Sequence, residues 1–379
     1  MKIVHLTDSM EMGGAEKLIE SLCRVQRQQG HDPVVHCLYR IGMLGDKLCD
    51  EGFEVTTNEA ATSVGRAYNA HVLFRRYRPD VVHCHNATAT IVGAIPARFA
   101  GAKRVVATRH GLVAPPYSLR QELKFAVASR WCDAIVAVCG QTWHNLIAAP
   151  LAARSKIVCI YNAVEAVRCN GFPSLIKSGF TLLHIARLSP PKDQKNLLRA
   201  FALARAEVPD LQLWIVGDGP ARSELEHLVR ELGITSNVTF FGERAVVAPF
   251  FAAADLFVMS SVTEGLPLSL LEAMSVGLPA VVTDVGGMGE VARMSKAIIS
   301  VPRSNPMALA NAIREVAQLR GDLSRLQDAA RQCYAANFTL ERMANEYMLL
   351  YSGLGVCARK VIGKTTPFAK TIEEASHRS

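Results

Sequence analysis

The hydrophobic positions of this 379-residue chain fall in short runs rich in Val and Ile, separated by longer amphipathic stretches. Such runs predict buried strands, and most of the stretches between them have helical periodicity. The first half contains predicted strands at residues 2–8, 33–39, 54–58, 80–85, 104–110, 134–139 and 156–161. The second half contains them at residues 181–188, 211–219, 237–242, 255–261, 280–285 and 297–301. Strands that alternate with helices predict parallel sheets covered on both faces.

This alternation is interrupted between residues 165 and 179, where the periodicity is lost. The chain is also longer than one ordinary domain. We therefore predict an α/β protein of two doubly wound, Rossmann-like domains, whose strand ends face one central cleft because such sheets bind ligands there. The predicted segments are an N-terminal domain at 1–164, a linker at 165–179, a C-terminal domain at 180–335, a helix at 336–354 and a flexible basic tail at 355–379.

The most informative stretch is EGLPLSLLEAMSVGLPAVVTDVGG at residues 264–287. A predicted strand ends before it, and Gly and Pro form a loop that leads into a helix. The residues of this loop and helix start are Glu264, Gly265, Leu266, Pro267 and Leu268, and Glu272 follows one turn into the helix. Free N–H groups at a helix start attract an anion, and a neighbouring carboxylate suits sugar or ribose hydroxyls. The stretch therefore predicts a site for a nucleotide sugar.

The spacing of Glu264 and Glu272 within EGLPLSLLEAM closely resembles the signature of the retaining nucleotide-sugar glycosyltransferases of family 4, which have the GT-B fold. The resemblance extends from about residue 1 to residue 354. It implies that Glu264 is a catalytic residue that holds sugar hydroxyls, and that Glu272 holds the ribose. It also implies that the helix at 336–354 crosses back to the N-terminal domain.

Two cations precede this stretch in a segment running from a strand into a helix. Arg187 ends the strand, and Lys192 lies on the following Pro-rich turn. Both can reach one diphosphate, Arg as a planar fork and Lys as a point charge. The segment resembles the family's G-R-L-x-x-x-K pattern, with Ala186 in place of its first glycine. Arg244, in Phe-Gly-Glu-Arg, falls where the family holds the nucleotide base with backbone groups, so we include it among the donor-binding residues.

Further candidates lie in the first half. Gly13 and Gly14 follow the first strand and open a helix, so a ligand phosphate can approach the backbone there. The full G-x-G-x-x-G fingerprint is missing, which argues against NAD. His110 closes a predicted strand, and the family has a histidine there that touches the donor sugar at the reaction centre. The alternative is a hydrogen-bonded histidine with a structural role.

His83 and His85 lie two residues apart and therefore on one face of a strand, which raises the alternative of a metal site. No carboxylate or third histidine accompanies them at ligand spacing. The chain also has no Asp-x-Asp motif for a metal-bound diphosphate. We therefore expect neither a metal nor another cofactor, and we expect His85 to line the cleft wall.

Positive charge is concentrated in the first half, because residues 1–178 carry 21 Lys and Arg against 14 Asp and Glu while the whole chain has a net charge of +8. This asymmetry favours an anionic partner, either a pyrophosphate-bearing acceptor or an anionic membrane surface bound by the N-terminal domain. A basic surface without a partner is the alternative. Nucleic acid is disfavoured because no nucleic-acid-binding module is visible.

No apolar run reaches the length of a membrane span, and the N-terminus reads as a strand and not as a signal peptide. The ten cysteines form no C-x-x-C pair, which indicates reduced thiols. We expect a cytoplasmic protein, peripheral on the inner face of the membrane if the basic half binds lipid.

The resemblance thus implies a metal-independent hexosyltransferase that moves a sugar from a nucleoside diphosphate sugar, UDP-linked in our expectation, to a glycan or lipid-linked acceptor of the cell envelope. An epimerase or phosphorylase of similar architecture, and a non-catalytic nucleotide-sugar-binding subunit, are the alternatives. A non-catalytic subunit whose active site had degenerated would normally have lost Lys192, Glu264 or Glu272, and all three are present.

Overall fold

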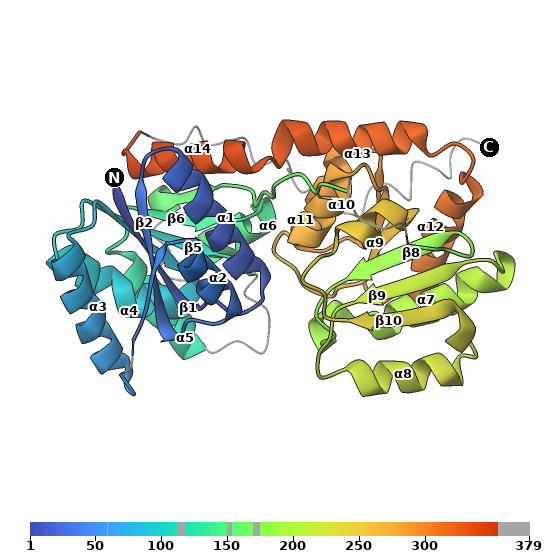
Figure 1. The fold of residues 1–379 in the computed structure, drawn as a ribbon, viewed down its shortest axis with the longest axis horizontal. Coiled ribbons are helices and arrows are strands. Elements are labelled where there is room, and N and C mark those ends of the chain that lie inside the picture. The colour runs from blue at the N-terminus through green and yellow to red at the C-terminus, as the bar shows by residue number, and fades with distance from the viewer. Residues whose placement is uncertain (59, 112–118, 150–153, 170–174, 355–379) are drawn as a thin grey trace.

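The computed structural model describes residues 1–58, 60–111, 119–149, 154–169 and 175–354, which form two α/β lobes side by side (Figure 1). Every predicted strand forms, and all strand pairs within the two sheets are parallel. The predicted α/β fold class, with two parallel sheets built from the two halves of the chain, is therefore confirmed. The predicted tail at 355–379 lies outside the described residues.

The first sheet has seven strands in the order β3-β2-β1-β4-β5-β6-β7. Their bounds are β1 Lys2–Ser9, β2 Asp32–Arg40, β3 Glu54–Thr57, β4 Val81–His85, β5 Arg104–Arg109, β6 Ala134–Ala137 and β7 Ile157–Cys159. The strand order reverses between β1 and β4. Ligands of doubly wound sheets bind beyond the carboxyl ends of the strands at such a reversal.

Helices cover both faces of this sheet because alternate residues of each buried strand point to opposite faces. The helices of this lobe are α1 Gly14–Gln28, α2 Met43–Asp50, α3 Ser63–Tyr77, α4 Asn86–Phe99, α5 Leu119–Ser129 and α6 Gly140–Ala148, with a short 3₁₀ turn at Arg154–Lys156. One face packs against α1 and α2, and the other packs against α3, α4, α5 and α6. On the face that packs against α1 and α2, these two helices leave the part over β4 to β6 uncovered.

The second sheet has six strands in the order β10-β9-β8-β11-β12-β13, with its reversal between β8 and β11. Its strands are β8 Thr181–Ile185, β9 Gln212–Val216, β10 Val238–Gly242, β11 Leu256–Met259, β12 Ala280–Thr283 and β13 Ile298–Val301. One face packs against α7 Gln194–Glu207, α8 Arg222–Glu231 and α12 Pro306–Gln318. The other packs against α9 Ala248–Ala253, α10 Leu268–Ser275, α11 Gly286–Met294 and α13 Ser324–Asn337. Short 3₁₀ turns lie at Pro190–Lys192 and Thr235–Asn237.

The last described helix, α14 Leu340–Tyr351, returns to the first lobe after α13, as Figure 1 shows. Met343, Tyr347 and Tyr351 are buried against Val81, Val106 and Val136 of the first sheet. This helix thereby fills the face that α1 and α2 leave uncovered. Burial of each large apolar side chain stabilises this packing by roughly 1.5–3 kcal/mol. No described helix combines the length and apolar character that crossing a membrane requires.

Candidate functional site

Lys192 and Glu264 meet where the loops after β8 and β11 come together. Lys192 ends a 3₁₀ turn, and its ammonium pairs with Glu264 Oε1. Ser261 Oγ donates to the same carboxylate oxygen over 2.7 Å. The Glu264 side chain is 11% exposed and that of Lys192 is 24% exposed, so solvent screens this pair only in part. A carboxylate and a cation predicted to contact one ligand are thus in direct contact with each other.

The turn that carries Lys192 is hydrogen-bonded to the loop that follows β11. Ser260 Oγ donates to the carbonyl oxygens of Lys192 and Asp193 over 2.9 Å each. The Val262 N–H donates to the Pro191 carbonyl, also over 2.9 Å. These bonds hold both loops at the strand-order reversal of the second sheet, where a ligand is expected.

The backbone after Glu264 is enclosed on both sides by other backbone. A Cβ added to Gly265 would lie 2.4 Å from the His110 carbonyl oxygen, and the Gly287 N–H donates to the Gly265 carbonyl over 2.6 Å. Gly286 has a φ of +53°, and a Cβ there would lie 1.9 Å from the Glu264 carbonyl oxygen. Only glycine fits at these two positions. The loop is therefore pressed between the end of β5 in one lobe and the start of α11 in the other.

Helix α10 starts directly after this loop. Its N-cap, Pro267, provides no side-chain hydrogen bond, and its first turn has no acidic residue. The N–H groups of this turn are thus left for an anion. Gly14 at the start of α1 approaches Leu268, since a Cβ on Gly14 would lie 4.0 Å from Leu268 Cγ. Gly13, the N-cap of α1, likewise has no capping side chain. Two helix N-termini, one from each lobe, therefore converge here.

Glu272 lies one turn into α10. Burial raises the pKa of its carboxyl group, while the Lys17 ammonium of α1 acts in the opposite direction. An element of the first lobe thus influences a donor-binding candidate of the second.

The two cations Arg187 and Arg244 are exposed and form no ion pair among the described residues, so their assignment to the donor stays a prediction.

His110 follows β5. Its backbone N–H donates to Asn86 Oδ1 over 3.2 Å, and its ring nitrogen Nε2 lies 3.0 Å from His85 Nδ1. Asn86 adopts a left-handed backbone with φ 68° at the start of α4, which asparagine tolerates better than most residues. Burial lowers the pKa of His110 to about 4, so the imidazole is neutral at physiological pH. A neutral imidazole can accept a hydrogen bond from a sugar hydroxyl.

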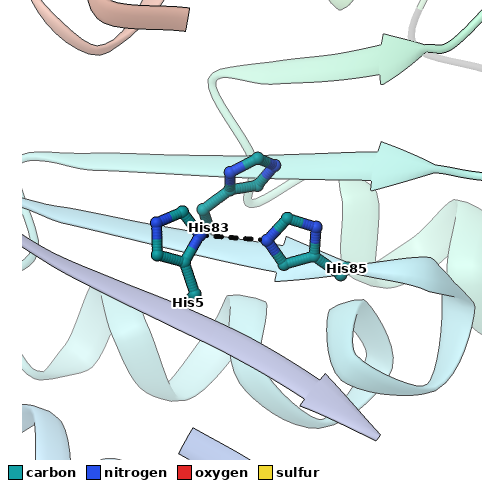
Figure 2. Close-up of side chains that lie close together, drawn as sticks. All are labelled: His5, His83 and His85. Atoms are coloured by element: carbon teal, nitrogen blue, oxygen red, sulfur yellow. Dashed lines mark hydrogen bonds between the residues drawn. The ribbon is translucent and has the colours of Figure 1, made fainter. Parts of the chain in front are cut away.

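His85 is fully buried behind His110 and does not line a cleft wall, so that expectation was wrong. The expectation that no third histidine accompanies His83 and His85 was also wrong, because β1 places His5 beside them (Figure 2). One ring nitrogen from each of these histidines lies within 4.8 Å of the others. Strand pairing accounts for this arrangement, since His5 and His83 are register partners.

Sequence analysis missed two acidic residues at the reversal of the first sheet. Asp8 lies at the carboxyl end of β1, and Glu16 lies in the first turn of α1. Burial raises the pKa of both carboxyl groups, and the charge of Asp8 raises that of Glu16 further. The position of Asp8 at the end of a predicted strand could have revealed it, because ligands bind at such ends.

The sequence analysis also did not predict a contact between the two lobes. Glu290 of α11 is buried, and its carboxylate accepts from the N–H groups of Gly140 and Gln141 over 2.8 and 2.6 Å. Tyr161 donates to the same carboxylate over 3.0 Å. A negative charge from the second lobe thus neutralises the N-terminus of α6 in the first. Asn162 adds a bond from its side-chain amide to the Leu266 carbonyl, over 2.9 Å.

The chain is similar to glycosyltransferases over most of its length. Residues 12–168 match the family described as Glycosyltransferase Family 4, and residues 172–333 match Glycosyl transferases group 1. An Escherichia coli UDP-Gal:alpha-D-GlcNAc-diphosphoundecaprenol alpha-1,3-galactosyltransferase is 27% identical over 244 residues, 57% of this chain and 60% of that protein. The N-acetyl-alpha-D-glucosaminyl L-malate synthase of Bacillus anthracis is 26% identical over 294 residues, 73% of this chain and 75% of that enzyme.

Solved structures agree on the fold. Anabaena Alr3699/HepE in complex with UDP has a TM-score of 0.82 at 22% identity, covering 93% of this chain and all of that one. The same protein in complex with UDP-glucose gives a TM-score of 0.81. Two parallel sheets of this topology, the loop between Glu264 and Leu268, and the two family matches agree. The chain belongs to the group 1, family 4 glycosyltransferases and has the GT-B fold.

Proposed function

We propose that this glycosyltransferase moves a hexose from a UDP-sugar to a hydroxyl of a lipid-linked or polysaccharide acceptor, with retention at the anomeric carbon. The observation that carries the proposal is the convergence of Lys192, Glu264 and the uncapped start of α10 on one loop beside His110. A diphosphate, a sugar and a nucleoside each find a suitable chemical group there.

Stabilisation of the leaving group is the main demand of this reaction. Negative charge develops on the diphosphate as the glycosidic bond stretches, and preorganised donors that meet this charge lower the barrier. Lys192 and the N–H groups at the start of α10 supply such donors, and the exposed Arg187 can join them. Glu264 then holds sugar hydroxyls while it keeps Lys192 in place, and Glu272 binds the ribose.

His110 approaches this loop from the first lobe, since its carbonyl oxygen lies against Gly265. The neutral ring contacts the donor sugar in the proposed complex. We favour attack by the acceptor hydroxyl on the face that the diphosphate leaves, with the leaving phosphate accepting the proton. The UDP-containing HepE structures and the diphosphoundecaprenol-linked substrate in the name of the E. coli relative support the donor and the acceptor class.

A thermal-shift panel tests the donor assignment. We expect UDP and its sugars to raise Tm more than GDP, ADP or NAD, equally with and without EDTA, because binding to the folded state alone stabilises it. Glu272→Ala should reduce the shift with UDP, whereas Glu231→Ala on the exposed end of α8 should not. Stabilisation by NAD alone, or by nothing in the panel, contradicts the assignment. Conversion of the UDP-sugar without an acceptor would identify an epimerase instead.

The basic first half fits an anionic membrane surface. The outward side of α5 exposes Arg120, Lys124, Leu123 and Val127, the last two 41% and 53% exposed. These residues, with Ile91 and Ile95 of α4 and Ala128, line an open groove of about 570 Å³. The one acidic residue of α5, Glu122, is paired with Arg109 over 3.0 Å. Cations beside exposed apolar groups suit a lipid interface, and we propose that the enzyme is peripheral on the inner face of the membrane.

Liposome sedimentation tests this surface. We expect binding that rises with the fraction of anionic lipid and falls with added salt, because each basic residue near such a surface contributes about 1 kcal/mol. The double variant Arg120→Glu, Lys124→Glu should lose most of this binding. Arg230→Glu on α8 of the other lobe is the matched control and should bind as the unmodified protein does. Equal binding to neutral and anionic vesicles would contradict the proposal.

A further inference from the structure

A file of hydrogen-bonded side chains runs from the interior of the first lobe to His110. Gln26 Oε1 of α1 lies 2.8 Å from His5 Nε2. His5 Nδ1 lies 3.0 Å from His85 Nε2, and His85 Nδ1 lies 3.0 Å from His110 Nε2. Gln26, His5 and His85 are each fully buried. The last ring nitrogen of the file, His110 Nδ1, is buried and has no partner among the described residues.

The amide oxygen of Gln26 fixes the direction of every bond in this file. An amide oxygen only accepts, so His5 must carry its proton on Nε2. A neutral ring has one protonated nitrogen, so His5 Nδ1 accepts from His85 Nε2. The same argument places the proton of His110 on Nε2. His110 Nδ1 is then left with a free lone pair.

Burial keeps the rings neutral, as this argument requires. It lowers the pKa of His5 and of His110 to about 4 and that of His85 well below its usual range. His83 of β4 and the phenols of Tyr347 and Tyr351 from α14 face the same region. Burial lowers the pKa of His83 and raises those of both phenols, so all three are neutral as well. Because every ring is neutral, the direction of the hydrogen bonds determines which nitrogen of each ring carries the proton.

A metal ion bound by His5, His83 and His85 is the alternative interpretation of the cluster in Figure 2. All six ring nitrogens of these histidines already have hydrogen-bond partners, because His83 bonds to the Tyr351 hydroxyl over 2.6 Å and to Thr108 Oγ1 over 2.7 Å. The His83 ring also lies with its centroid 4.0 Å from that of His85, at 35° to it. Rings that lie over one another do not direct their in-plane lone pairs at one shared ion.

We propose that Gln26, His5 and His85 are positioning residues that hold His110 in one tautomer, with the proton on Nε2 and the Nδ1 lone pair ready to accept from a donor-sugar hydroxyl. This inference rests on the proposed function, in which His110 contacts the donor sugar. With its tautomer fixed, the His110 ring is already a hydrogen-bond acceptor before the nucleotide sugar binds. The other tautomer would present an N–H at this position, which could donate to a sugar oxygen but could not accept from a hydroxyl.

The test reads the tautomer directly, by ¹⁵N NMR of protein labelled at histidine, with the His110 signals assigned through His110→Gln. We expect a protonated Nε2 and a bare Nδ1. Gln26→Met removes the anchoring oxygen at similar volume, so it should give a mixture of tautomers. It should also raise KM for the donor about two- to tenfold, the equivalent of one neutral hydrogen bond, with kcat changed less. Gln26→Glu restores an accepting oxygen and should restore the single tautomer.

His36→Gln is the matched control, because His36 is buried on β2 of the same sheet but bonds to Thr56 outside the file. It should leave the His110 signals as they are. A proton on His110 Nδ1 in the unmodified protein, an unchanged tautomer in Gln26→Met, or one tightly bound metal ion per chain would each overturn the proposal. The tautomer is measured without substrate. A correct tautomer together with no response to any UDP-sugar would therefore reject the proposed function and leave the file intact.

Discussion

Replacement of Gly265 by alanine is expected to lower the rate of sugar transfer by about a hundredfold. An added Cβ would lie 2.4 Å from the His110 carbonyl oxygen, where neither backbone segment can move independently. The Gly265 carbonyl is bonded to Gly287 N, and the next carbonyl, of Leu266, is bonded to Asn162 Nδ2. The strain must therefore displace Glu264 and the start of α10 together. Misplacement of reacting groups by about 1 Å can cost on the order of a hundredfold in rate.

The measurement is the initial rate with a saturating UDP-sugar, accompanied by circular dichroism to show that the variant folds. Gly321→Ala is the matched control, since a Cβ there meets no atom within 4 Å. It should retain full activity. If Gly265→Ala has the rate of the unmodified enzyme, the loop between the lobes is more yielding than its contacts indicate, and its role in positioning the donor is rejected.

Replacement of Lys192 by alanine is expected to reduce kcat/KM for the donor about ten- to a hundredfold. The change removes the proposed charge-assisted bonds to the diphosphate, which are worth about 1.5–3 kcal/mol. It also leaves Ser261 as the one remaining hydrogen-bond partner of the largely buried Glu264 carboxylate among the described residues, so a negative charge faces the site without its counter-ion. That charge repels the diphosphate. The variant should consequently bind uridine normally and UDP weakly.

Lys195→Ala is the control, because Lys195 lies three residues later on α7 and forms an exposed pair with Glu224. It should be nearly neutral, as exposed ion pairs contribute little. Kinetics of Lys192→Ala, Glu264→Gln and the double variant separate the two effects, since neighbours in one network are not additive. A normal kcat/KM in Lys192→Ala would remove this lysine from the donor site.

The strands were predictable because parallel strands buried on both faces need continuous apolar runs, and such runs are visible in the sequence. The loop from Glu264 to Leu268 was predictable for a similar reason, because strand, loop, glutamate and helix start are consecutive along the chain. The roles assigned to Arg187 and Arg244 remain predictions, since exposed side chains obtain their partners only when a ligand is bound.

Contacts between distant segments were not predictable. His5 joins His83 only because β1 and β4 pair in a particular register, and Glu290 reaches Gly140 only after both lobes have folded. The same holds for α14, whose target on the first sheet exists once α1 and α2 have left it uncovered. Local patterns of apolar spacing and turn residues thus determined the elements and the loop from Glu264 to Leu268. The tertiary structure alone decided which buried polar groups became partners, because burial without a partner is costly and the partner can come from anywhere in the chain.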